Sequence, residues 1–465
     1  MHIKRRFSRT AWPVLIGFLA LDGCASVPPV DEAIDRARLE PQTIVGARGA
    51  LSAAQSKAIL DRLAQQTPGS DLLAQHLAIE QALAAAPLVA GNRTSVLQDG
   101  PATFRAMFAA IRAAKRYVYL EYYIFENVES DGEHLEDLLL AKRQQGVAVS
   151  VIYDSYGSID TPIEFLDHLK AAGVAILEFH PLNPLKAGNG YSINDRDHRK
   201  ILIADGETAI IGGVNLYTAY QPHPHARLVA SDGDNPDTWH DTDLRIQGPA
   251  VRQLEHVFLD HWTAQGGPAL PEIAAAPVPA APGNEVVRII GSDHDDTVPR
   301  YYATLVSALR NAQKTIWLTT AYFVPTEDEM DALERAARRG VDVRLMLPGK
   351  SDSSLALAVG HSEYGDLLEA GVKIFELQDG MLHSKSAIID GVWSVIGSSN
   401  FDHRSILFND EVDAVVLGRD TADQLAAVFA KNAATAREVT LAEWRDRPLS
   451  EKLREIYAQA VKNLL

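Results

Sequence analysis

Short apolar runs alternate with longer amphipathic segments through most of the chain. β-Branched and aromatic residues dominate the runs at 116–125, 147–154 and 174–180, which is typical of buried strands. Between these runs, the segments 132–146 and 162–173 have apolar residues at helical spacing. Strands that alternate with helices in this way predict an α/β sheet covered by helices on both faces.

The second half of the chain repeats this order. Strand-like runs at 314–324, 341–349 and 372–377 alternate with helical segments at 328–340 and 364–371. Because the same series of elements occurs twice, the sequence predicts an internal duplication.

Composition shifts divide the chain further. An Ala/Leu-rich pair of helical segments, expected to act as packing or spacer helices, precedes the first repeat, and a helical tail follows the second. We expect the tail to pack on the second repeat rather than lie on a membrane. The predicted units are an export signal at 1–23, a tether and helical segment at 24–87, a first domain at 88–265, a Pro/Ala-rich linker at 266–284, a second domain at 285–420 and a helical tail at 421–465.

The overall charge argues against one class of partner. The chain has 465 residues, a formal net charge of -17 and a pI of about 5.3. Sequence-blind binding to nucleic acid needs a basic surface, so the composition disfavours a nucleic-acid partner.

The amino terminus has the features of an export signal. Basic residues at 1–9 precede a short apolar run, and Cys24, the only cysteine in the sequence, follows Leu-Asp-Gly. A cysteine directly after Leu-x-Gly resembles the lipobox of bacterial lipoproteins, in which the cysteine is lipidated. This predicts a membrane-anchored, periplasm-facing lipoprotein of a bacterial cell envelope, and Ala25 after the cysteine favours the outer membrane over the inner. The alternative is an ordinary signal peptide.

Two hairpins carry the candidate chemistry. His198 and Lys200 are two residues apart in a predicted strand and therefore share a face. A two-residue Asp205-Gly206 turn would place His198 opposite Gly213, with Asn215 just beyond. The second hairpin has the same spacing, and gathers His383, Lys385, Asp390, Ser398 and Asn400. The small residues at 212–213 and 397–398 are expected to leave room for a substrate.

The side-chain types point to phosphate esters. An ammonium suits phosphate, a carboxamide can donate to a phosphoryl oxygen, and imidazole can attack phosphorus or transfer protons near neutral pH. The sequence has no phosphate-binding loop of the G-x-x-x-x-G-K-[ST] type, no H-E-x-x-H and no G-x-S-x-G. A metal could in principle bind the histidines of segment 223–227 with His240, but we expect a polar surface loop there, and no metal or cofactor.

Both hairpins follow the pattern H-x-K-x4-D-x6-G-x2-N, beginning at His198 and at His383. Two such motifs resemble the paired HKD motifs of the phospholipase D superfamily. From about residue 88 onward, segments such as "LEYYIFEN", "GVDVRLMLPGKSD" and "GSSNFDHRS" are similar to bacterial cardiolipin synthases. The resemblance implies two tandem phospholipase D-like α-β-α domains, related by a pseudo-twofold axis and sharing one active site.

The resemblance also implies roles for the motif residues. One histidine, assigned to His198, attacks the phosphodiester, and His383 protonates the leaving alcohol and then deprotonates the incoming one. Lys200, Lys385, Asn215 and Asn400 would hold the phosphoryl oxygens.

The acidic residues have different expected roles. Asp205 and Asp390 complete the catalytic motifs, but they lie at the turns on the opposite strand face, so we expect them to be structural. Asp241 and Glu411 resemble the acids that orient each histidine, and Asp243 competes with Asp241 for this role.

The function implied is phosphatidyl transfer, in which phosphatidylglycerol in a phospholipid membrane is both donor and acceptor and cardiolipin is the product. The alternatives are a phospholipase D that uses water as acceptor, a nuclease of the same superfamily, and a non-catalytic lipid-binding lipoprotein.

Overall fold

The computed structural model describes residues 27, 30–36, 43–183, 192–221, 239–270 and 280–460. The predicted signal and Cys24, segment 223–227 and the middle of the predicted linker lie outside the described residues. Within the described residues, no helix is long and apolar enough to cross a bilayer.

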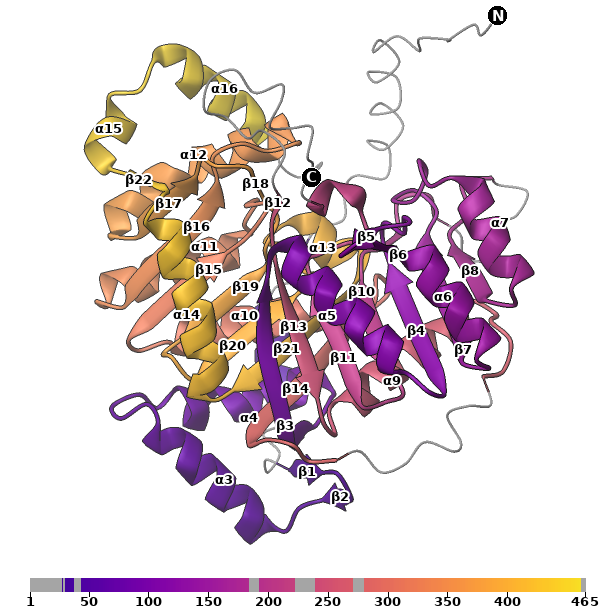
Figure 1. Ribbon diagram of the computed structural model, residues 1–465. Coiled ribbons are helices and arrows are strands. Elements are labelled where there is room, and N and C mark those ends of the chain that lie inside the picture. The colour runs from indigo at the N-terminus through magenta and orange to yellow at the C-terminus, as the bar shows by residue number, and fades with distance from the viewer. Residues whose placement is uncertain are drawn as a thin grey trace, which may run out of the picture.

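Two sheet units of the same topology make up most of the molecule (Figure 1). In the first unit the strand order is β8-β7-β4-β10-β11-β13-β3, with β4, β7 and β8 parallel and the other neighbours antiparallel. Its strands are β3 (Leu88–Gln98), β4 (Tyr117–Tyr122), β7 (Ala148–Asp154), β8 (Ala175–Phe179), β10 (Lys200–Ala204), β11 (Thr208–Gly212) and β13 (Thr242–Gln247).

The second unit repeats this order as β17-β16-β15-β19-β20-β21-β14. Its strands are β14 (Glu285–Ser292), β15 (Thr315–Thr319), β16 (Asp342–Pro348), β17 (Lys373–Leu377), β19 (Ser386–Ile389), β20 (Trp393–Gly397) and β21 (Asn409–Leu417). The predicted duplication and the α/β fold class are confirmed.

The leading strands β3 and β14 pair antiparallel with each other, so the two sheets are continuous. Apolar side chains from both sheets, including Val89, Ile211 and Val287, form one buried cluster across this junction. Helices cover the sheets, as the apolar faces of the strands require. They are α5 (Asp99–Ala113), α6 (Leu135–Gln144), α7 (Ile163–Ala171) and α9 (Val251–Ala264) in the first unit, and α10 (Arg300–Asn311), α11 (Glu327–Arg338), α12 (Ser354–Ala370) and α14 (Arg419–Ala433) in the second.

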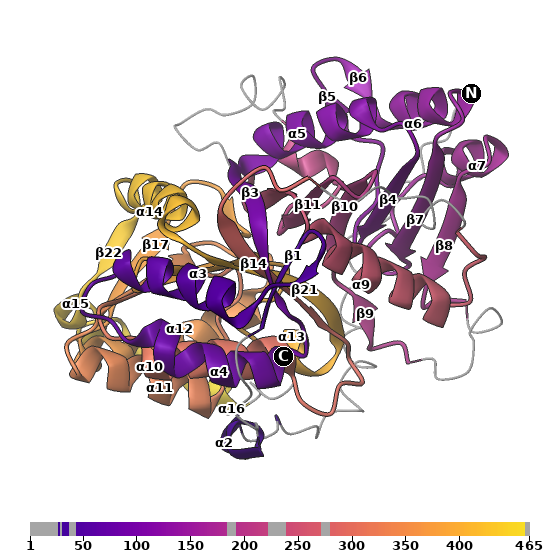
Figure 2. The same cartoon turned by 90° about the horizontal axis from the view of Figure 1, so that it is seen from below.

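The amino-terminal helices pack on the second unit, as Figure 2 shows from below. Helix α4 lies against α10, where the His76 ring hydrogen-bonds the Ser307 hydroxyl at 3.0 Å. Buried Glu80 of α4 also pairs with Arg288 of β14 at 3.0 Å. The remaining elements at this end are α2 (Val30–Arg36), β1 (Ile44–Gly46), β2 (Gly49–Ala50), α3 (Ala53–Gln65) and α4 (Leu72–Ala84).

The carboxy-terminal elements extend the second unit. The boundary expected at residue 420 falls inside α14, because the apolar face of this helix is buried against the sheet and includes Leu425 and Phe429. After α14 come β22 (Arg437–Val439), which pairs with the edge strand β17, then α15 (Leu441–Arg445) and α16 (Leu449–Ala460). Helix α16 packs on α12.

Two short parallel pairings connect the units beside the motifs. Strand β9 (Arg196–Asp197) of the first unit pairs with β21 of the second, and β12 (Trp239–His240) pairs with β18 (Met381–Leu382). Each motif histidine follows such a strand, and its backbone N–H donates to the opposite unit: His198 to the Asp410 carbonyl at 2.9 Å and His383 to the His240 carbonyl at 2.8 Å. The backbone therefore brings the two motifs together at the junction.

Candidate active site

The hairpin register differs by one residue from the register counted from sequence. Ala204 pairs with Thr208, so the loop has three residues instead of two, and Lys200 comes opposite Gly212. Asp205 and Gly206 have positive φ, and the Glu207 N–H bonds the Ala204 carbonyl, which makes Glu207 the extra residue. The second hairpin shows the same shift.

The acid that orients His198 comes from the other unit. The Nδ1 atom of His198 lies 3.0 Å from both carboxylate oxygens of Glu411, which is 213 residues away in β21. Burial first, and then the two motif lysines, hold the pKa of His198 well below its usual range. Burial also raises the pKa of Glu411 to about 7. His198 is thus a neutral imidazole whose Nε2 atom is left for a substrate.

His383 is oriented in the same crosswise manner by Asp241, whose Oδ2 atom lies 2.8 Å from its Nδ1 atom. The Tyr220 hydroxyl donates to the same carboxylate oxygen at 2.8 Å. Although burial opposes it, His383 and Lys385 lower the pKa of Asp241, which stays ionised. Of the two candidates from the sequence, Asp241 and Asp243, it is therefore Asp241 that contacts His383. Burial and Lys385 lower the pKa of His383, while Asp241 raises it.

The motif lysines are buried beside the histidines. Each ammonium donates to the backbone carbonyl of its own motif histidine, Lys200 at 2.5 Å, and Lys385 likewise. Burial lowers the pKa of Lys200 to about 7 and that of Lys385 to about 8. Two cations this close repel each other until an anion binds between them, which suits a phosphate ester.

A cavity of about 310 Å³ opens between the two units over the histidines. Its lining includes His198 and His383 together with Asn215 and Asn400, so four of the predicted site residues meet. The Asn215 side-chain oxygen accepts the Ile124 N–H at 3.2 Å, which turns its amide N–H₂ group toward other partners.

Two arginines in this cavity were not predicted. Arg196 precedes His198 by two residues and lines the cavity with it, so the period-two rule of extended backbone could have found it. Arg404 lies on α13 (His403–Leu407), four residues after Asn400 in the sequence, and donates two hydrogen bonds to Asn194. Both add positive charge where an anionic substrate would bind.

Asp205 and Asp390 lie at the far ends of their hairpins, as expected from their position at the turns. The Asp205 carboxylate accepts three consecutive backbone N–H groups, from residues 115, 116 and 117, at 2.7 to 3.0 Å. Asp390 accepts the N–H groups of residues 313, 314 and 315 in the same way. The structure does not bring either aspartate to the cavity; each ties its turn to the neighbouring strand.

The sequence suggested that the glycines leave space for a substrate, and this expectation is wrong. A Cβ atom on Gly212 would lie 2.2 Å from an Asp243 carboxylate oxygen, and one on Gly397 would lie 2.0 Å from an Asp413 oxygen. Each glycine instead makes room for a buried acid. Burial raises the pKa of Asp413 to about 8, and burial together with Asp241 raises that of Asp243 well above its usual range.

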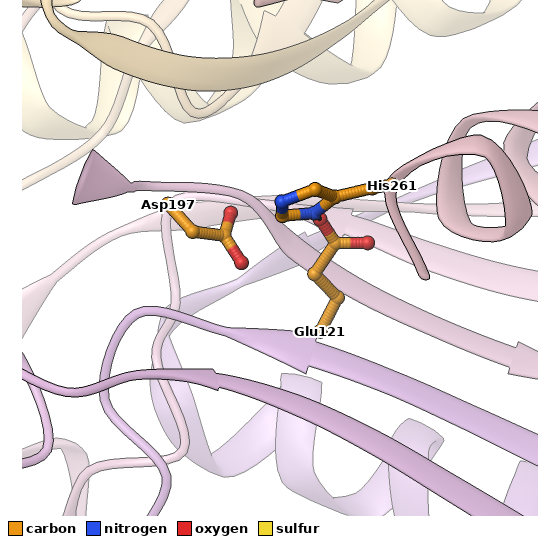
Figure 3. Close-up of side chains that lie close together, drawn as sticks. All are labelled: Glu121, Asp197 and His261. Atoms are coloured by element: carbon orange, nitrogen blue, oxygen red, sulfur yellow. Dashed lines mark hydrogen bonds and ion pairs between the residues drawn. The ribbon is translucent and has the colours of Figure 1, made fainter. Parts of the chain in front are cut away.

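A second group of titratable side chains lies behind the first motif. Figure 3 shows Glu121 from β4, Asp197 from β9 and His261 from α9 pointing toward one another, with ligand-type atoms within 4.8 Å. Arg199 lies 3.4 Å from Glu121, and despite burial, Glu121 raises the pKa of His261 to about 9. Arg199 and His261 both pair with Glu121, while burial and then Glu121 raise the pKa of Asp197 well above its usual range. The group therefore fits an ion-pair network that fixes β9, and His198 with it, better than a metal site.

Comparison with known proteins agrees with this geometry. The family model described as "Cardiolipin synthase, PLD-like domain" matches residues 107–222 and 305–433. A cardiolipin synthase of Geobacillus kaustophilus is 33% identical over 386 residues, which cover 82% of this chain and 74% of the relative. A protein of Bacillus cereus named cardiolipin synthase 2 is 32% identical over 382 residues, covering 80% of this chain and 71% of the relative.

The chain belongs to the cardiolipin synthase family of phospholipase D-like proteins. Membership confirms the resemblance predicted from the paired motifs and the enzyme class that it implies, a phosphatidyltransferase of the phospholipase D type. The fold of the family is also seen in a phosphatidylserine synthase of Haemophilus influenzae, which aligns with a TM-score of 0.61 at 14% identity over 83% of this chain and 99% of that one.

Proposed function

We propose that this member of the cardiolipin synthase family transfers a phosphatidyl group from one phosphatidylglycerol to another through a phosphohistidine on His198. The observation that carries the proposal is the crossed pair of histidine–acid contacts, His198 with Glu411 and His383 with Asp241, over a single cavity.

In the first step, the Nε2 atom of His198 attacks phosphorus and the bond from phosphorus to the glycerol oxygen breaks. The leaving oxygen takes a proton from His383, so free glycerol departs. In the second step, the hydroxyl of another phosphatidylglycerol gives its proton to His383 and attacks phosphorus as the P–N bond breaks. Cardiolipin forms and both histidines return to their starting states.

The difference between the two acids supports this assignment of roles. Asp241 remains ionised and can stabilise an imidazolium at His383, as a general acid requires. Glu411, with a pKa raised to about 7 by burial, supports a positive charge on His198 less strongly, which suits a neutral nucleophile. Lys200, Lys385 and the cavity arginines would offset the phosphoryl charge.

The experiment is a product assay by mass spectrometry with purified protein and phosphatidylglycerol vesicles, and with His198→Ala and His383→Ala as controls. Cardiolipin and glycerol in equal amounts, lost in both variants, support the proposal. Phosphatidic acid as the only product would make water the acceptor and the protein a phospholipase D. No lipid product under any condition would leave the non-catalytic lipid-binding alternative.

We further propose that Cys24 is lipidated after removal of residues 1–23 and anchors the protein to a bacterial envelope membrane facing the periplasm. The Leu-Asp-Gly-Cys sequence after a short apolar run supports this. Metabolic labelling with an alkyne fatty acid tests it: label on the wild type and none on Cys24→Ala supports lipidation, and equal label on both contradicts it.

A further inference from the structure

Helix α16 exposes an apolar face. Leu449, Leu453, Ile456 and Tyr457 are 58 to 70% exposed, and their spacing places them on one side of the helix. The opposite side is packed, because Ala458 is buried in a cluster with Val324 and Ala356 of the second unit. The helix is therefore held in place with its apolar side turned to solvent.

This face lies beside the mouth of the active-site cavity. Val324 and Ala356, on which α16 packs, also line the cavity. The first unit also exposes large apolar side chains, which we call the first-unit cluster. They are Tyr156, Ile159 and Ile163 between β7 and the start of α7, and Ile193, and they are 40 to 65% exposed.

The first-unit cluster is also tied to the cavity wall. The Ser158 hydroxyl, between Tyr156 and Ile159, donates to the backbone carbonyl of Tyr123, which lines the cavity. In Figure 1, α16 and α7 both lie toward the top of the molecule, the end to which β4 points. In the described part of the chain, all exposed large apolar side chains belong to these two clusters.

The size of the cavity explains why apolar side chains would be exposed near its mouth. At about 310 Å³, it is at the low end of the roughly 300–1,000 Å³ of ligand pockets, enough for a phosphoglycerol head group. Two long acyl chains cannot fit as well. The acyl chains of a phospholipid whose phosphorus reaches His198 must therefore remain outside the mouth, between the two clusters.

We propose that the two apolar clusters insert into a phospholipid bilayer and hold the cavity mouth against it. The proposal rests on the proposed function, because it takes a bilayer lipid as the substrate. The net charge of -17 opposes attraction to anionic lipid, so apolar contact supplies the adhesion, and the exposed Arg454 flanks the α16 face, where it can meet an anionic head group. A second copy of the chain bound to both clusters is the alternative occupant, but it would cover the cavity mouth and keep membrane lipids out.

The test measures depth in the membrane at chosen positions. In the full chain with Cys24→Ser, a fluorophore is attached at Tyr457→Cys or Ile163→Cys, and at Ala58→Cys on the exposed face of α3 as the matched control. Phosphatidylglycerol vesicles with brominated acyl chains should quench the label at 457 and 163 but not at 58. Quenching at none of the three positions would overturn the proposal. A spectral change that depends on protein concentration and not on vesicles would overturn it in favour of self-association.

Activity provides a second readout. The triple variant Leu453→Ser, Ile456→Ser, Tyr457→Ser should lose on the order of 100-fold in cardiolipin formation from vesicles, and less than about twofold with dispersed short-chain phosphatidylglycerol. Ala54→Ser with Ala58→Ser on α3 should change neither rate. If the triple variant loses equal activity on vesicles and on dispersed short-chain phosphatidylglycerol, the proposed membrane-binding role of the two clusters is wrong. Quenching at 457 and 163 without cardiolipin from either substrate would instead leave the surface standing and reject the proposed function.

Discussion

Replacing Asp241 by asparagine removes a charge from one unit and should disable the histidine of the other. The Asp241 carboxylate lies 2.8 Å from His383 Nδ1 and is buried. At this separation and an effective dielectric constant of about 20, two unit charges attract by about 6 kcal/mol. Asparagine keeps a hydrogen-bonding oxygen in place, so about 2–4 kcal/mol of transition-state stabilisation should be lost, or about 30- to 1,000-fold in kcat/KM.

The pH profile of Asp241→Asn distinguishes loss of charge from general damage. Because Asp241 raises the pKa of His383, the variant should lower that pKa further. His383 would then lose its proton at lower pH, and the alkaline limb of kcat/KM should move to lower pH. The assay is the initial rate of cardiolipin formation from phosphatidylglycerol vesicles across pH 5 to 9.

Asp243→Asn is the matched control. Asp243 is also buried, and burial raises its pKa well above the usual range, which favours the neutral carboxyl form that asparagine resembles. Its rate should stay within about threefold of wild type, less than 1 kcal/mol. If Asp241→Asn keeps more than about a third of the wild-type rate, or if both variants lose activity equally, the charge of Asp241 is not what supports His383.

Three further outcomes follow from the structure. Lys200 and Lys385, with pKa values lowered to about 7 and about 8 by burial, lose their charge as pH rises, so above pH 7 to 8 kcat/KM should fall more steeply than loss of the His383 proton alone would make it fall. Protonation of His198 should give an acid limb, and a flat profile would contradict both expectations. Asp205→Ala should lower the free energy of unfolding, measured in urea, by about 2–4 kcal/mol, because three backbone N–H groups lose their acceptor. The folded fraction should stay active, and an inactive variant of unchanged stability would contradict a structural role. Arg404→Ala should raise KM for phosphatidylglycerol about tenfold with a smaller change in kcat, whereas an unchanged KM would place Arg404 outside substrate binding.

The periodic sequence signals predicted the fold well. The duplicated order of strands and helices follows from short apolar runs and helical spacing, and the paired motifs located His198 and His383. The leading strands β3 and β14 were not predicted as the elements that join the sheets, because an antiparallel pairing between two repeats leaves no local mark in either one.

Contacts between the units could not be read from the sequence. Asp241 and Glu411 were recognised as candidate acids, but each serves the histidine of the other unit, and only the crossed pairings beside β9 and β12 make this possible. The glycine at position 212 was misread because the acid that fills the space beside it lies on a different strand, β13. The one-residue shift of the hairpins arises from an extra loop residue that an Asp-Gly pair does not disclose.

In the proposed reaction, one histidine of a shared site carries the phosphatidyl group. Rapid alkaline quenching of the protein during turnover of phosphatidylglycerol, followed by peptide mass spectrometry, tests it directly. We expect a phosphatidyl adduct on His198 that appears before cardiolipin and is absent from His198→Ala. An adduct on His383, or cardiolipin formed with no adduct on either histidine, would contradict it.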